Sequence, residues 1–221
     1  MKNQPYYFEI KDMVTHFVAA FDDVIINRYN RTREVTDKIQ VNYAYAPKQR
    51  VLHDLINKSQ HITLPAIAIT INEVTRDESR VFNKIAGFWD KRPNTSTTEF
   101  LPAPVPINIG ISMSILTKFQ SDMDQILSNF VPYSNPYIII SWPLPADLTN
   151  RVTEIRSEVE WDGSISLEYP IEIDGNTPAR VTADTSFTIK GWLFPYTSTL
   201  SACNIFTVTT NFTPVTGFDY I

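Results

Sequence analysis

Apolar and polar residues alternate over a long stretch in the middle of the sequence. The apolar members of this stretch are Val105, Ile107, Ile109, Ile111, Met113 and Ile115. Successive side chains of a β-strand point to opposite faces, so a period of two is typical of a strand with one apolar and one polar face. The pattern therefore predicts one long strand whose apolar face packs against other parts of the chain.

A helix signal follows this strand directly. Residues 117–120, Thr-Lys-Phe-Gln, match the S/T-x-x-E/Q capping box, in which the Thr hydroxyl accepts an N–H of the first turn and the Gln side chain reaches back to the cap N–H. Apolar residues then recur at helical spacing at Phe119, Met123, Ile126, Leu127 and Phe130. We therefore expect an amphipathic helix that packs on the sheet, with Leu127 in the core.

The same two periodicities define the other elements. They predict helices at 10–21 and 47–56, and strands at 24–29, 38–45, 67–71, 137–142, 181–193 and 205–212. Residues 152–169 read as a hairpin that turns at Asp162-Gly163. With about three helices and eight strands and no repeating βα order, the predicted class is α+β, with a mixed, mainly antiparallel sheet and about three packed helices. No linker divides residues 1–221, so we expect a single domain.

Composition bears on several functional classes. Of the 221 residues, 43% are hydrophobic and 12% aromatic, which excludes disorder of the whole chain. The net charge is −5, and residues 121–221 carry four basic and twelve acidic groups, so no conspicuous basic patch for nucleic acid is present. The N-terminal residues lack the apolar core of a signal peptide, and no apolar run could span a bilayer, so we expect no membrane partner. Cys203 is the single cysteine, which fits a reducing compartment.

Residue patterns typical of catalysis or cofactor binding are missing from the sequence. The six glycines are isolated, so they cannot build a phosphate-binding loop, and there is no HExxH, CxxC or GxSxG motif. Two pairs of carboxylates remain, Asp122 with Asp124 and Glu158 with Glu160. The second pair can share one strand face, as in a glycosidase, although acidic residues on a solvated strand face are much commoner. The sequence predicts no enzyme and no cofactor.

Three segments carry a resemblance to a known family. They are 38–52 (KIQVNYAYAPKQRVL), 105–120 (VPINIGISMSILTKFQ) with its helix and the closing 131–136 (VPYSNP), and 187–195 (FTIKGWLFP). In this order and spacing they resemble the tail sheath stabiliser protein of contractile-tailed bacteriophages, over roughly residues 6 to 196. Each segment is structural, so order and spacing carry the resemblance.

The resemblance implies a structural virion protein with the fold of phage tail-terminator proteins. It implies a ring of six copies at the head-proximal end of the tail, which caps the tube and the contractile sheath and joins the tail to the neck. The implied partners are further copies of the chain, the tail sheath protein, the tail tube terminator and the head neck proteins. The genomic DNA would pass through the ring without specific binding, and assembly would take place in the host cytoplasm.

Two other interpretations stay open. The chain could be another ring protein of the head–tail joint, such as the tube terminator or a head-completion protein. It could also be a small hydrolytic or binding module with the Glu158 and Glu160 face as its site. A ring protein should form a defined oligomer or join tail ends, whereas a hydrolase needs neither.

Residues 75–104 follow neither period and are predicted to form a long loop or arm, called the arm below. Thirty residues without a clear period are uncommon in a compact domain and are often functional. The arm mixes basic and aromatic side chains, and arginines and aromatics are enriched at interface cores. The candidate interface residues are Arg76, Arg80, Phe82, Phe88, Trp89 and Arg92. The alternative is a solvent loop whose aromatic side chains fold back on the domain.

Overall fold

The computed structural model describes residues 7–57, 63–81, 87–91, 98–144, 153–169 and 180–195. In these ranges the helices are α1 (Glu9–Ala19), α2 (Lys48–Asn57) and α3 (Gln120–Tyr133). The strands are β1 (Ile25–Tyr29), β2 (Val35–Gln40), β3 (Asn42–Tyr45), β4 (Ala66–Arg76), β5 (Gly87–Lys91), β6 (Thr98–Pro102), β7 (Val105–Thr117), β8 (Tyr137–Pro143), β9 (Glu154–Glu168) and β10 (Val181–Leu193).

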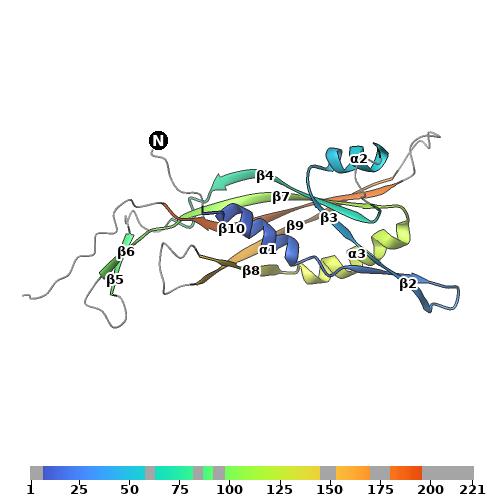
Figure 1. The fold of residues 1–221 in the computed structure, drawn as a ribbon, viewed down its shortest axis with the longest axis horizontal. Helices are drawn as coiled ribbons and strands as arrows, with labels where there is room; N and C mark the ends of the chain where they lie inside the picture. Colours follow the sequence, from blue (N-terminus) through green and yellow to red (C-terminus); the bar gives the residue numbers. More distant parts are fainter. Residues whose placement is uncertain are drawn as a thin grey trace, which may run out of the picture.

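Six strands form one central sheet in the order β3-β4-β7-β10-β9-β8 (Figure 1). Only β3 and β4 run parallel, and the other neighbours are antiparallel. The predicted long strand is β7, which pairs with β10 from Val105 opposite Leu193 to Thr117 opposite Val181. The predicted α+β class with a mixed, mainly antiparallel sheet is confirmed.

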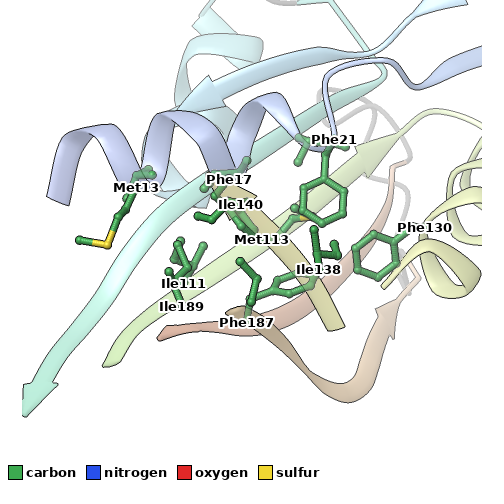
Figure 2. Packing of buried hydrophobic residues seen from close by; sticks show 14 of the residues in the cluster. Met13, Phe17, Phe21, Ile111, Met113, Phe130, Ile138, Ile140, Phe187 and Ile189 are labelled. Carbon is green, nitrogen blue, oxygen red and sulfur yellow. The ribbon is translucent and has the colours of Figure 1, made fainter. Parts of the chain in front are cut away.

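One face of the sheet is covered by α1 and α3. Figure 2 shows side chains of both helices directed at the apolar faces of β7 and β10. The rings of Phe17, Phe21 and Phe130 each lie within 5.7 Å, centroid to centroid, of another ring of this cluster, and all three contact Phe187. Edge-on and tilted ring contacts of this kind stabilise a core beyond the area that they bury.

Gly191 of β10 lets α1 approach the sheet closely. A Cβ atom at this position would lie 2.4 Å from Sδ of Met13, a side chain of α1 that is fully buried. The glycine in segment 187–195 (FTIKGWLFP) therefore has a packing role.

The opposite face of the sheet is polar and only partly covered. At one end α2 packs Val51 on Ala68 and Leu116 in a second, smaller core. Further along, the face carries Ser112 of β7 and Lys190 of β10, which are half-buried. We call this surface the open face.

Two ribbons project from opposite ends of the long axis of the molecule (Figure 1). At one end β1 pairs with β2, and at the other β5 pairs with β6, both antiparallel. The arm is therefore not a structureless loop: it contains the end of β4 and the ribbon β5–β6. Its period of two is hidden in the sequence because apolar residues stand side by side at Phe88-Trp89 and at Phe100-Leu101.

The predicted capping box does not form. Thr117 stays in β7, fully buried opposite Val181, and the N-cap residue of α3 is Phe119 in extended conformation. The Gln120 side chain donates to Oδ1 of Asp124 at 2.8 Å instead. Thr117 pairs in the sheet and therefore does not cap the helix. Two further residues, 118 and 119, lie between the end of the strand and the first residue of α3.

The apolar stripe of α3 is placed slightly differently from the prediction. Met123, Ile126 and Phe130 are buried, whereas Leu127 is only half-buried and Phe119 is 45% exposed. The helix continues through Pro132 to Tyr133. Leu127 therefore lies at the margin of the core rather than within it.

Residues 154–168 form one strand and not a hairpin. Gly163 has a φ of +77°, and residues 162–164 of β9 stand opposite the single residue Ser186, because Phe187 pairs with Trp161 and Thr185 with Ile165. Asp-Gly makes a bulge here, since β10 is long enough to pair with β9 on both sides of it.

The strand predicted at 38–45 is split between two sheets. Its first part is β2, in the ribbon with β1, and its second part is β3, parallel to β4. Between them the buried Val41 donates its N–H to the carbonyl of Val24 at 3.3 Å. The predicted strand at 205–212 lies outside the described residues.

Candidate assembly surfaces

The arm is fastened to the body through the side chain of Arg80. Its Nε donates to Oδ2 of Asp77 at 2.7 Å, and its Nη2 donates to the carbonyl of Ile107 at 2.6 Å and to Oδ1 of Asn108 at 3.0 Å. The guanidinium carbon lies 4.9 Å from the ring centroid of Trp192, a distance suited to a cation–π contact. Arg80 thereby ties the turn after β4 to β7 and β10. We call Asp77, Arg80, Asn108 and Trp192 the arm root.

Asp77 organises the turn that presents Arg80. Its Oδ1 accepts the N–H of Ser79 at 2.9 Å and the Ser79 hydroxyl at 2.5 Å. These hydrogen bonds, the Ser79 hydroxyl first and then Arg80, hold the pKa of the Asp77 carboxyl well below its usual range. The turn therefore contains a fixed negative charge that holds the arginine in place.

The predicted interface residues fall in different places. Arg76 is exposed at the end of β4, and Arg80 is committed to contacts within the chain. Phe88 and Trp89 belong to β5, opposite Leu101 and Phe100. Phe82 and Arg92 lie outside the described residues.

Sequence reasoning missed the roles of Asp77, Asn108 and Trp192 in the arm root. Sequence signals exist for two of these residues. Asp-x-Ser at 77–79 is a pattern common in turns that an Asp side chain stabilises. Trp192 directly follows Gly191, so its side chain lies on the opposite face of β10 from the glycine.

The open face carries two ion-pair clusters. Lys190 lies between Glu158, 3.5 Å away, and Glu160, with which it makes a short contact. The hydrogen bond to Glu160 is the main reason that the pKa of Lys190 is raised. Both carboxylates of the predicted acidic pair are therefore engaged by one lysine, as in a structural ion-pair cluster on a strand face.

The second cluster connects α2 to the sheet. Lys48 Nζ lies 2.6 Å from Oδ2 of Asp184 and 3.1 Å from Oε2 of Glu168. Ser114 donates to the other oxygen of Asp184 at 2.5 Å. Burial lowers the pKa of Lys48, but the hydrogen bonds to the two carboxylates outweigh it and raise the pKa overall. The ammonium group is thus held charged.

The β1–β2 ribbon is fixed at its base to α3. Arg28 donates to Oδ2 of Asp122 at 2.8 Å, and its guanidinium carbon lies 4.7 Å from the Phe119 ring centroid. The side chain of Asp122 is 2% exposed, so Arg28 neutralises a buried charge. Asp124 is exposed and bonds to Gln120, which separates the predicted pair of carboxylates.

Within the described ranges, no cluster of three or more His, Cys, Asp or Glu side chains could hold a metal ion. Among the helices of the same ranges, none has the length and apolarity needed to cross a membrane.

The protein-family comparison is decisive. A family model described as "T4-like virus Myoviridae tail sheath stabiliser" matches residues 5–218. The chain belongs to this tail sheath stabiliser family. It is therefore a structural protein of the contractile phage tail, which confirms the family and the class of function predicted from the sequence.

This member of the tail sheath stabiliser family was also compared with curated proteins and with solved structures. No curated protein sequence matches the chain. Among solved structures it is similar to a sheath/tube terminator of an extracellular contractile injection system, PVC, determined by cryo-EM in the extended state. The identity is 13% and the TM-score 0.39, with 98% of this chain and 67% of that chain covered.

The segments that carried the resemblance to the tail sheath stabiliser family all contribute to the central sheet. Residues 38–52 include β3 and the start of α2, 105–120 contain β7, and 187–195 contain the end of β10. In the last of these segments, Gly191 allows the close approach of α1, and Trp192 is part of the arm root. The segments thus support both the core and the base of the arm.

Proposed function

We propose that the chain forms a ring of six copies that ends the tail tube and the contractile sheath and joins the tail to the neck of the head. The observation that carries this proposal is the match of residues 5–218 to the tail sheath stabiliser family. The proposed partners are neighbouring copies, the tail sheath protein, the tail tube terminator and the head neck proteins. The proposed location is the head-proximal end of the virion tail, after assembly in the host cytoplasm.

The shape of the chain supports a closed ring. A cyclic ring needs a heterologous interface, in which one end or side of each copy meets a different surface of the next. The ribbons at the two ends of the molecule (Figure 1) are different surfaces of this kind. The ion pairs of the arm root and of the Arg28–Asp122 contact give each ribbon a fixed base.

The arm is the surface that we propose for contacts with a neighbouring copy or a tail partner. Arg76, Phe82, Phe88, Trp89 and Arg92 would make these contacts, and Arg80 would hold their base in position. The basic groups of the arm complement residues 121–221, which carry twelve acidic and four basic groups. We further propose that residues 1–221 act as one domain of which the arm is a part.

The passage of DNA fits the charge of the chain. Each copy has a net charge of −5. Every basic contact to a phosphate would add salt-dependent affinity and slow the passage of the genome. We therefore expect polar and acidic groups along the lumen, mainly from residues after 121, and no tight binding of duplex DNA at physiological salt.

In the proposed role the protein acts through its contacts with other proteins and not by catalysis. The Glu158 and Glu160 side chains both form ion pairs with Lys190, as in a structural cluster on a strand face, and this arrangement does not favour the hydrolytic alternative. Neither an enzymatic activity nor a cofactor is part of the proposal.

Reconstitution tests the proposal. Purified tails that lack this protein are mixed with wild-type protein, with Trp89→Ala and with Arg50→Ala, which alters an exposed residue of α2 outside both ribbons as a control. We expect wild type and Arg50→Ala to bind at one tail end and to permit head joining, as seen by electron microscopy, and Trp89→Ala to bind more weakly. Binding along the tail, or no binding by the wild type, would contradict the proposal. Equal binding by all three proteins would show that the arm is not part of the interface.

A further inference from the structure

An apolar groove of about 700 Å³ lies beside α1. One wall is formed by α1 with Ile10, Val14 and Val18, and the other side is lined by Tyr45 at the end of β3 and Ile71 of β4. Tyr45 is 64% exposed, so the groove is open to solvent in the described part of the chain. Exposed apolar surface that is hollowed in this way usually has an occupant.

The floor of the groove adjoins an unpaired strand edge. β3 pairs with β4 only from Ala66 to Ile69, whereas β4 continues to Arg76 and pairs with β7 on its other side. Among the described strands, none pairs with the outer edge of residues 70–76. Native proteins commonly cover or block such edges, because unpaired N–H and C=O groups recruit another strand.

The chain itself leaves the sheet beside this groove. The N–H of Phe194, just after β10, donates to Oε1 of Glu9 in the first turn of α1 at 3.0 Å. The described part of the chain therefore ends close to Ile10, where the lining of the groove begins. A connection of nine residues, 196–204, spans at most about 30 Å, and α1 with eleven residues is only about 16 Å long.

The composition of residues 196–221 fits an apolar groove and a strand edge. Asp219 is the single charged side chain in this segment, which is rich in threonine, valine, isoleucine and aromatic residues. These residue types favour strands. The alternation at 205–212 predicts a strand there.

We propose that residues 196–221 of the same chain dock in the α1 groove, with residues 205–212 added as a strand to the outer edge of β4. Main-chain hydrogen bonds to β4 would give affinity, and alternate apolar side chains would fill the groove between α1 and Ile71. This inference does not depend on the proposed function, because it concerns the folding of a single copy.

Photo-crosslinking with isotope labels tests the proposal in the full-length chain. In a Cys203→Ser background, Thr15→Cys places a benzophenone maleimide in the groove, since Thr15 is exposed and lines it. His16→Cys is the matched control, because His16 is exposed on the same helix but does not line the groove. Equal amounts of unlabelled and 15N-labelled protein are mixed before irradiation, and crosslinked peptides are identified by mass spectrometry.

We expect crosslinks from position 15 to peptides of 196–221 with both peptides of the same label, and at least about 5-fold fewer from position 16. Pairs of mixed label would show that a second copy occupies the groove and would overturn the proposal. Crosslinks confined to residues 1–6 or to other segments would overturn it as well, as would equal yields from the two positions.

Hydrogen exchange of the wild-type chain provides a second readout that needs no variant. The amides of residues 70–76 that do not bond to β7 should exchange at least about 100-fold more slowly than unpaired amides, because a docked strand would bond to them. Exchange of these amides at the rate of unpaired groups would exclude a strand on this edge.

Discussion

The side-chain amide of Gln125 binds both backbone groups of Asn27, 98 positions earlier in the sequence. Gln125 Oε1 accepts the N–H of Asn27 at 2.9 Å, and Gln125 Nε2 donates to its carbonyl at 3.0 Å. The amide therefore acts toward β1 as a neighbouring strand would, and it joins the base of the β1–β2 ribbon to α3.

Loss of this amide should loosen the ribbon. We expect Gln125→Ala to lower the free energy of unfolding by about 1–3 kcal/mol, because two part-buried backbone groups lose their partner. Asn129→Ala is the control, since Asn129 is exposed on the same helix and, among the described residues, its side chain bonds to the carbonyl of Gln125 within α3. Chemical denaturation measures both variants, and equal stability of the two would show that the Gln125 contact is energetically unimportant.

The arm root makes a second prediction. Arg80→Ala should lower the free energy of unfolding by about 1–3 kcal/mol, because Arg80 makes three hydrogen bonds and stacks on Trp192. Arg76→Ala removes the same charge from an exposed position four residues earlier and should change stability by less than about 0.5 kcal/mol.

The arginine pair also separates two roles of the arm. If Arg80 served only in an interface, as its place among the candidate interface residues suggests, its replacement would have little effect on folding. Its contacts within the chain predict a loss of stability instead. If thermal melting of Arg80→Ala and Arg76→Ala is the same, the arm root does not stabilise the chain.

The core face of α3 gives a third prediction. Ile126 is 1% exposed, so Ile126→Ala should cost about 2–5 kcal/mol, the usual range for emptying a packed site. Leu127 is half-buried at the margin of the core, so Leu127→Ala should lower the free energy of unfolding by less than Ile126→Ala does. Urea denaturation of both variants decides between the two orientations of the helix, because a larger loss for Leu127→Ala would restore the orientation that the sequence suggests.

Glu9 makes the stability depend on pH. Burial raises the pKa of Glu9 above its usual value, and the hydrogen bond from the Phe194 N–H opposes this effect only in part. The folded chain therefore holds the Glu9 proton to a higher pH than the unfolded chain does. Stability contributed by this group is present below the unfolded pKa and is lost as the pH rises through the folded pKa.

Glu9→Gln isolates this contribution. The glutamine oxygen can still accept the Phe194 N–H, but it does not titrate. We expect the variant to gain stability relative to wild type as the pH rises above about 4.5, the ordinary value for a glutamate. Melting temperatures from pH 4 to 8 measure the difference, and a difference between the two proteins that stays constant with pH would contradict the assignment.

The parts of the fold that were predictable from the sequence are those set by local periodicity. The alternation of 105–115 and the helical spacing of 10–21 follow directly from the burial of one face, so β7 and α1 were predicted close to their bounds. Asp162-Gly163 shows the limit of such reasoning, because the same dipeptide suits a hairpin turn or a bulge. The length of the partner strand β10 decides between them.

The contacts that hold the candidate surfaces together could not be predicted in this way. Arg80 and Trp192 approach each other only because β4 and β10 both border β7, and Arg28 meets Asp122 only because β1 lies against α3. Periodicity identifies faces of elements, whereas these pairs depend on how elements from distant parts of the chain are placed side by side.

A cryo-EM reconstruction of the head-proximal end of intact tails tests the central claim most directly. The account predicts that the six-stranded sheet β3-β4-β7-β10-β9-β8 fits six times into a closed ring around the channel, above the last sheath ring, with the arms at contacts between copies or with tail partners. Density for the chain elsewhere in the virion, or a single copy that makes no ring, would contradict the account.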